Sequence, residues 1–188
     1  MLPAILLALH SGCGSAPAIP ESEARAMKAA LMPADDLVAA HNRWRERFKV
    51  QKLAWSATAA QVAQSWADTL STENCEMRHN PDPARRKGFG ENIYRYWSTK
   101  TYDGYQRDSD TVVDRWGGEE QWYDSQSHEC EAPEGAGCGH FTQLVWQYST
   151  HVGCGRARCD KAEVWVCNYF PRGNMENVEP FAADGSGS

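Results

Sequence analysis

The chain has 188 residues and a formal net charge of −6, and 41% of its residues are hydrophobic. This length predicts one domain with a core of its own. The composition is too apolar for a disordered chain, and no basic run supplies the patch that nucleic acids bind, which excludes nucleic acid as a partner. No apolar run reaches the roughly 18–20 residues of a transmembrane helix, so we expect no membrane span.

The N-terminal 13 residues resemble an export leader. Met1–Leu9 is a short apolar run, followed by Ser11-Gly12-Cys13. This pattern predicts a secretion signal, and a Cys at this place also fits lipid attachment as in bacterial lipoproteins. The sequence leaves both interpretations open. Residues 14–33 are small, charged and Pro-bearing, and we expect a linker there.

Two amphipathic helices are predicted at the start of the domain. Over residues 35–48 the apolar side chains recur at helical spacing, and Asp35 or Asp36 is the expected N-cap. Residues 56–70 repeat the pattern, with Ser56 as the expected N-cap.

The remaining pattern indicates the fold class. Residues 80–90 contain Pro and Gly and are predicted to be a loop, and a third helix is predicted over residues 110–123. Strands over 151–159 and 164–170 are expected to form a β-hairpin. The second strand is apolar on both faces and therefore needs cover on both sides. We predict an α+β fold, an α–β–α sandwich whose central antiparallel sheet carries helices on both faces.

Glu119 is the first candidate for chemistry. Helical spacing from Val112 places it on the inward face, where a carboxylate needs a partner or water. The alternative is that the helix breaks at Gly117-Gly118 and that Glu119 is a solvated residue at the rim.

Three further side chains are candidates. His140 follows Gly139 and precedes an apolar run, so we expect it at a helix start, where the positive end of the dipole keeps the imidazole neutral. Glu91 follows a Gly-rich loop, and His79 closes the segment that Cys75 opens. Each has a structural alternative: a backbone-bonded His140, a loop-bracing Glu91 and an exposed loop residue His79.

The segments Gly139–Trp146 (GHFTQLVW) and Val166–Asn174 (VCNYFPRGN) resemble the two signature motifs of the CAP superfamily. This superfamily comprises cysteine-rich secretory proteins, antigen 5 and pathogenesis-related proteins, and its domain is also called the SCP domain. The resemblance spans residues 34–179, which we take as the domain, with 180–188 as a flexible tail. It implies an α–β–α sandwich. Five shorter blocks also match: His41-Asn42, Leu53–Trp55, Gly90–Ile93, Trp116–Tyr123 and His151–Gly155.

The resemblance implies a cleft with two His and two Glu. Motif by motif these are His79, Glu91, Glu119 and His140, whereas His41 belongs to the first helix and not to this set. Two imidazoles with carboxylates and water can hold Zn²⁺ or another divalent cation, and Glu91 or Glu119 is then the candidate catalytic base.

The family mostly binds ligands. The resemblance therefore implies a secreted or periplasmic-envelope binding protein with a lipid, sterol or protein ligand. A zinc-dependent, peptidase-like hydrolase that uses the same four residues is the alternative. We expect a monomer, either free or lipid-anchored through Cys13.

Six of the seven cysteines lie between positions 75 and 167. An even number without a C-x-x-C pair predicts three disulfides and an oxidising compartment. A hairpin that turns at Asp160-Lys161 places Cys154 opposite Cys167. The resemblance implies the pairs Cys75–Cys159, Cys130–Cys138 and Cys154–Cys167.

Overall fold

The computed structural model describes residues 32–82 and 88–182. The predicted leader with Cys13, most of the linker, the middle of the predicted loop and the end of the tail lie outside the described residues. The elements in chain order are α2 (Ala34–Arg47), β1 (Ala54–Trp55), α3 (Ala57–Ser71), β2 (Gly90–Trp97), α5 (Ser109–Gly117), the 3-10 helix η1 (Gly118–Trp122), α6 (Gly139–Leu144), β3 (His151–Arg158) and β4 (Ala162–Phe170).

The four strands form one sheet in the order β1-β3-β4-β2. The predicted hairpin is confirmed, because β3 and β4 pair in antiparallel register with Cys154 opposite Cys167. β2 adds a second antiparallel pairing to β4. The sheet is not purely antiparallel as predicted: β1 runs parallel to β3. The short connection from α2 to α3 passes along the edge of β3 in the direction of that strand, so the sheet is mixed.

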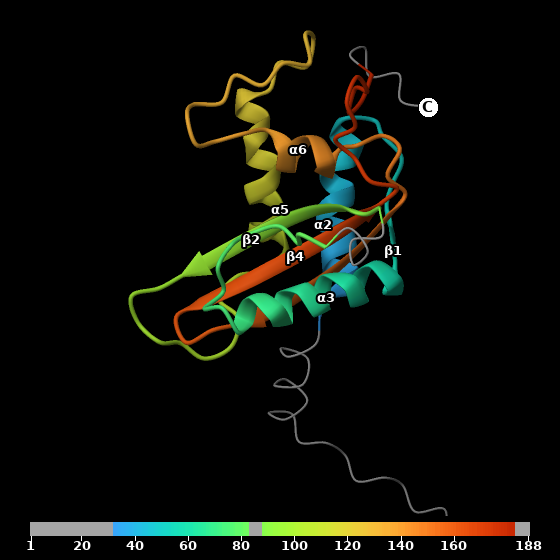
Figure 1. Cartoon of the computed structure of the whole chain (residues 1–188). Coiled ribbons are helices and arrows are strands. Elements are labelled where there is room, and N and C mark those ends of the chain that lie inside the picture. Colours follow the sequence, from blue (N-terminus) through green and yellow to red (C-terminus); the bar gives the residue numbers. More distant parts are fainter. Residues whose placement is uncertain (1–31, 83–87, 183–188) are drawn as a thin grey trace, which may run out of the picture.

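The sheet lies between two layers of helices, which confirms the α–β–α sandwich (Figure 1). α3 packs on one face, where its buried side chains meet the aliphatic residues of β4. α2, α5 and α6 cover the other face and share a core with the remaining side chains of the sheet. β4 is buried over Ala162–Tyr169, as expected for a strand that is covered on both faces.

The helix ends follow the predicted caps only in part. Ser56 caps α3 as predicted, since its hydroxyl accepts a hydrogen bond from Ala59 N (3.2 Å). The expected Asp cap of α2 is wrong: Pro33 stands at the N-cap, and Asp35 and Asp36 lie in the first turn. There the two carboxylates face the positive end of the helix dipole without closing a cap.

Arg45 holds the layer of α2 and α6 together, although the helical pattern gave no sign of its burial. Its guanidinium donates to the carbonyls of Leu144 (3.0 Å) and Trp146 (2.9 Å), and also to those of Gln51 and Ser149. Burial lowers the pKa of Arg45 to about 10, so it stays charged at neutral pH. The end of α6 is thereby anchored to α2.

Candidate functional site

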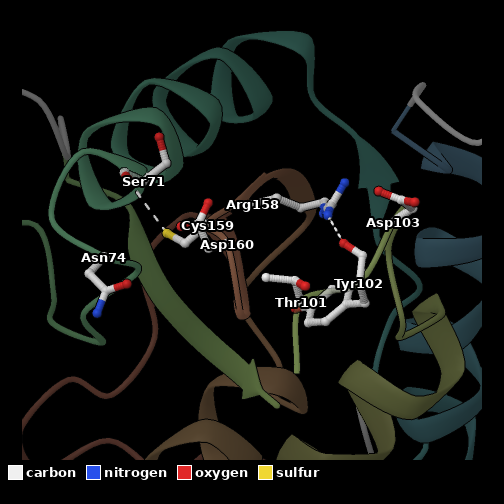
Figure 2. Close-up of a pocket in the computed structure, with 8 residues that line it drawn as sticks. All are labelled: Ser71, Asn74, Thr101, Tyr102, Asp103, Arg158, Cys159 and Asp160. Carbon is white, nitrogen blue, oxygen red and sulfur yellow. Dashed lines mark hydrogen bonds between the residues drawn. The ribbon is translucent and has the colours of Figure 1, made fainter. Parts of the chain in front are cut away.

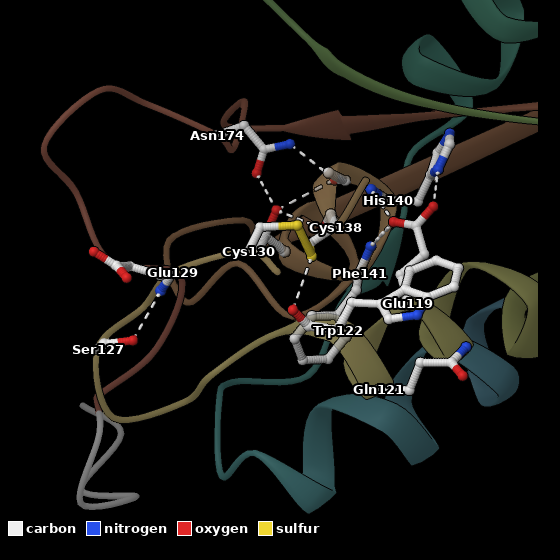
Figure 3. Close-up of a disulfide and its surroundings, with 12 residues drawn as sticks. Glu119, Gln121, Trp122, Ser127, Glu129, Cys130, Cys138, His140, Phe141 and Asn174 are labelled. Carbon is white, nitrogen blue, oxygen red and sulfur yellow. Dashed lines mark hydrogen bonds and ion pairs between the residues drawn. A yellow bond between two sulfur atoms is a disulfide. The ribbon is translucent and has the colours of Figure 1, made fainter. Parts of the chain in front are cut away.

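Glu119 and His140 form a closely bonded pair at the start of α6 (Figure 3). His140 Nδ1 donates to Glu119 Oε1 (2.6 Å). The second carboxylate oxygen accepts from two backbone amides, His140 N (2.9 Å) and Phe141 N (3.2 Å). Both oxygens of Glu119 are thus engaged, and the carboxylate caps the first turn of α6.

Both sequence interpretations of Glu119 hold in part. The helix does change at Gly117-Gly118, because α5 ends there and η1 continues as a 3-10 helix. Glu119 nevertheless lies inside, with its side chain only 15% exposed. The expectation that His140 stands at a helix start is confirmed, since α6 begins at Gly139.

His79 and Glu91 form the second pair. His79 Nδ1 donates to Glu91 Oε1 (2.8 Å), which also accepts from Asn80 N (3.0 Å). The Glu91 side chain is 1% exposed, whereas that of His79 is 60% exposed. Glu91 Oε2 is buried and has no partner in the part of the chain that the structure describes.

The two pairs share one chemical arrangement. In each, a carboxylate accepts the Nδ1 proton, which fixes the neutral imidazole in the tautomer whose Nε2 lone pair is free. No described residue hydrogen-bonds to Nε2 of His79 or of His140. Each imidazole therefore presents a nitrogen that can accept a proton or bind a metal ion.

Asn92 links the two pairs, a role that the sequence did not reveal. It follows Glu91 in β2, and its Nδ2 donates to the carbonyl of His140 (2.9 Å) and to the hydroxyl of Tyr169 (3.2 Å). That hydroxyl in turn lies 2.8 Å from His41 Nε2. His41 lies in α2, as predicted, and belongs to neither His–Glu pair.

The direction of these hydrogen bonds follows from His41. Its Nδ1 lies 2.7 Å from the carbonyl of Leu37, which can only accept, so Nδ1 carries the proton. Nε2 must then accept from the Tyr169 hydroxyl. Burial lowers the pKa of His41 to about 4 and raises that of Tyr169, so both are neutral near pH 7.

A close approach of β2 and α6 brings the pairs to the same end of the sheet. A Cβ atom on Gly90 would lie 1.9 Å from Gln143 Oε1, so a larger residue there would displace the Gln143 amide. The same Gln143 oxygen accepts from Gly173 N (2.9 Å). This buried amide therefore joins α6, the first residue of β2 and the chain after β4.

A metal centre with three protein ligands is not preformed within residues 32–82 and 88–182. No three His, Cys, Asp or Glu side chains stand there in a group that could hold an ion. The reason lies in the hydrogen bonds, since both oxygens of Glu119 and one of Glu91 are already engaged. Imidazoles with carboxylates behind them are donors of the kind that zinc sites use.

Three disulfides brace this scaffold. They join Cys75–Cys159, Cys130–Cys138 and Cys154–Cys167, the pairs that the resemblance implied. The second closes the loop that leads into α6, directly before His140 (Figure 3). Disulfides of this number are typical of proteins in oxidising compartments. None of the helices in the described residues is both long and apolar enough to span a membrane.

Two surface hollows differ in character. A polar one of about 620 Å³ lies beside the Cys75–Cys159 disulfide, where Arg158 donates to the Tyr102 carbonyl (Figure 2). Burial raises the pKa of Tyr102 to about 12. None of the four predicted site residues lines this hollow.

The second hollow has a volume of about 540 Å³ and is mainly apolar. Gly88, three residues before Glu91, is one of the residues that line it. Four large hydrophobic side chains that line it are exposed to solvent. Contiguous exposed apolar surface of this kind marks binding sites. We call it the apolar hollow; those four side chains are Tyr148, Phe170, Met175 and Val178, and Trp146, Pro171 and Arg172 complete the lining.

Comparison with known proteins now identifies the class. The family model described as "CAP: Cysteine-rich secretory protein family" matches residues 38–169. The chain is 36% identical over 151 residues to Pathogenesis-related protein 1A1 of Solanum lycopersicum, which covers 79% of this chain and 78% of that protein. The chain belongs to the CAP family.

Solved structures share the fold. BmVAL-1 superimposes with a TM-score of 0.64 at 24% identity, over 81% of this chain and 84% of that one. NaASP2, solved with Zn²⁺, gives a TM-score of 0.60 at 22% identity, over 79% and 84% of the two chains. These similarities show that the architecture is shared. The ligand of this protein has to be inferred from its own residues.

Proposed function

We propose that this protein is an exported binding protein whose two His–Glu pairs hold a divalent cation between His79 Nε2 and His140 Nε2. One observation carries the proposal: both imidazoles give Nδ1 to a carboxylate and keep Nε2 free. Carboxylate–histidine pairs of this kind orient metal ligands in proteins. In this arrangement Glu91 and Glu119 orient the imidazoles instead of binding the ion, which refines the four-ligand set expected from the sequence.

Asn92 connects the two pairs at the start of β2. Because Asn92 follows Glu91 and holds the carbonyl of His140, both pairs lie at the start of β2. A cation held by two protein ligands is completed by water, so exchange of the ion is expected to be easy. The three disulfides favour an extracellular or envelope location, and lipid attachment at Cys13 stays a prediction of the sequence.

Calorimetric titration of the disulfide-bonded full chain with Zn²⁺ at neutral pH tests the proposal. We expect one ion per chain and loss of binding in His79→Ala and His140→Ala. Glu91→Gln and Glu119→Gln should weaken binding by roughly 10–100-fold, the usual cost of removing an orienting partner. His151→Ala removes an exposed imidazole outside the pairs and is the matched control. Absence of binding, or equal binding in all the His variants, would refute the proposal.

For the hydrolase alternative, the geometry favours Glu91 over Glu119 as the general base. Both oxygens of Glu119 are engaged, whereas Glu91 Oε2 has no partner among the described residues. Turnover of a peptide library that disappears in Glu91→Gln and in the His79→Ala/His140→Ala double variant would support the alternative. Turnover unchanged in the double variant would exclude it.

The apolar hollow supports a second binding function, for a fatty acid or a sterol. Its exposed aromatic and aliphatic side chains surround a space open to solvent, and Arg172 is the one charged residue among the described residues that line it. Apolar walls with one polar group are typical of sites for lipids with a polar head.

Titrations with oleate and with cholesterol, followed by tryptophan fluorescence, test this second function. We expect saturable binding that is lost in Phe170→Ser. Trp97→Ser, which changes an exposed aromatic residue outside the hollow, is the matched control and should bind as the wild type does. If neither lipid binds, or if both variants bind equally, the hollow is not a lipid site and a protein ligand becomes the next candidate.

A further inference from the structure

The buried face of β2 and β4 carries a pair of polar side chains that the two His–Glu pairs do not explain. Asn168 lies directly opposite Glu91 in the antiparallel register, so the two side chains share a face of the sheet. Asn168 is fully buried. Neither its Oδ1 nor its Nδ2 has a partner among the described residues, and the same is true of Glu91 Oε2.

Apolar groups enclose this pair along the strands. Side chains two residues apart share a face, so Ile93 and Val166 flank the pair on the inner side, where they also stand opposite each other. Phe89 and Phe170 flank it on the outer side, with their ring centroids 5.7 Å apart. None of these four side chains can hydrogen-bond to the amide or to the carboxylate.

The first turn of α3 packs on the same face of the sheet, over the neighbouring strand β3. Gly153 in β3 stands opposite Asn168 on the other side of β4. A Cβ atom there would lie 2.2 Å from Ala60 N and 2.4 Å from Ser56 O, so α3 rests directly on the sheet. Glu91, Asn168 and Gly153 thus form one row across three strands, on the face of the sheet that α3 packs against.

Three unpartnered polar atoms in one enclosed place indicate a bound polar species. Buried amide and carboxylate groups are nearly always hydrogen-bonded, and ordered water is their usual partner where no protein group serves. The atoms present are two acceptors, Glu91 Oε2 and Asn168 Oδ1, and one donor, Asn168 Nδ2. A metal ion would be repelled by the amide protons and would find only two side-chain oxygens, whereas Ca²⁺ takes six to eight. Water can donate and accept.

We propose that Glu91 and Asn168 enclose a structural water site on the α3 face of the sheet, and that Asn168 is a positioning residue for the His79–Glu91 pair. The water donates to Glu91 Oε2 and exchanges a hydrogen bond with the Asn168 amide. This fixes the carboxylate so that Oε1 faces His79 Nδ1 and Asn80 N. The part of the inference that concerns metal binding rests on the proposed function; the water site does not.

Water-to-protein NOE and ROE spectra of the ¹⁵N-labelled full chain test the site directly. The Asn168 side-chain amide protons should show a dipolar cross-peak at the water frequency with the sign of a long-lived bound water. Proton exchange is recognised by its opposite sign relative to the ROE. No dipolar cross-peak, or a direct Asn168–Glu91 hydrogen-bond coupling, would overturn the water site.

Two variants test the positioning role. Asn168→Leu replaces the amide by an apolar group of similar size, while Asn168→Ser keeps a hydrogen-bonding group and leaves room for water. Long-range ¹H–¹⁵N spectra of the imidazoles report the tautomers. We expect the Nδ1–H tautomer of His79 to lose population in Asn168→Leu and to be retained in Asn168→Ser. His140, in the same spectra, should be unaffected in both. An unchanged His79 in Asn168→Leu, or equal changes at both imidazoles, would overturn the role.

Zinc titration of the same variants separates the two proposals. If the wild type binds Zn²⁺, Asn168→Leu should bind roughly tenfold more weakly, the scale of a lost orienting partner, and Asn168→Ser close to wild type. Equal affinity in both variants would count against the positioning role. A wild type that binds no Zn²⁺ overturns the proposed function, while the water and tautomer measurements still decide the present inference.

Discussion

The two His–Glu pairs consist of the same residue types, but they differ in how many oxygens of the carboxylate are hydrogen-bonded. Glu119 meets three donors, two of them the first amides of α6, and its imidazole partner is 30% exposed. Glu91 is more deeply buried, yet it engages one oxygen only, and its imidazole partner is largely exposed. A carboxylate that caps a helix serves the fold first. One with an oxygen that no described residue engages can bind a further polar species.

Removing each carboxylate in turn tests most directly whether the two pairs contribute differently to stability. Glu119→Ala leaves two backbone amides and an imidazole without an acceptor, so we expect the free energy of unfolding to fall by about 3 kcal/mol. Glu91→Ala leaves one backbone amide, Asn80 N, and the largely exposed imidazole of His79 without an acceptor, so a loss of about 1 kcal/mol is expected. Urea unfolding at pH 7 measures both. Equal losses would show that the pairs are equally structural.

Acid should loosen the chain of hydrogen bonds behind His140. The folded pKa of His41 is about 4, below the value of about 6.5 in the unfolded chain. Stability from its burial is therefore complete above pH 6.5 and is lost as the pH falls towards 4. Between pH 7.5 and pH 5 we expect a loss of about 2 kcal/mol from this group.

The variant His41→Gln isolates the effect, because it cannot gain a proton. The difference in unfolding free energy between wild type and variant should shrink in acid and stay constant above pH 7. A difference that does not depend on pH would contradict the expected pKa of His41.

Asn92→Ala tests the link between the pairs. It removes a part-buried hydrogen bond to the carbonyl of His140 and a buried one to Tyr169, and should lower the free energy of unfolding by about 1.5 kcal/mol. Amide hydrogen exchange should accelerate at the start of α6 more than at Asn80. Uniform acceleration would mean that Asn92 stabilises the whole domain rather than this link.

The smallest effect is expected from Tyr169→Phe. The ring stays in the core, and His41 Nε2 loses its donor, at about 1 kcal/mol. In thermal unfolding this variant should lie between wild type and Asn92→Ala. A larger loss than that of Asn92→Ala would place the centre of the network at Tyr169 instead.

Much of the fold follows from local patterns in the sequence. The α3 cap at Ser56 and the hairpin that pairs Cys154 with Cys167 depend on residues close together in the chain. β1 and β2 were not foreseen, because a two-residue strand has no periodicity and β2, at a sheet edge, mixes polar with apolar residues. The direction of β1, and with it the mixed sheet, is set by the tertiary path of the chain.

The candidate site, like the fold, was predictable from the sequence only in part. Motif resemblance singled out His79, Glu91, Glu119 and His140 because their residue types and order persist in the sequence. The sequence did not predict which atoms of these residues form hydrogen bonds. The partners of Glu119, for example, belong to a helix about twenty residues further along the chain. Asn92 and Asn168 gave no signal, as an asparagine in a strand has no pattern that marks it as buried.

By itself, the sequence determined the order of helices and hairpin, the cysteine set and the four ionisable residues. These depend on spacing along the chain and on side-chain chemistry. Only the tertiary structure decided that Glu119 caps the start of α6 and that Asn168 lies opposite Glu91 in the sheet. It also decided that one oxygen of Glu91 has no partner among the described residues. The physical reason is that hydrogen bonds between distant segments depend on the register of strands and on helix packing. A register shift of one residue would turn Glu91 or Asn168 to the other face of the sheet.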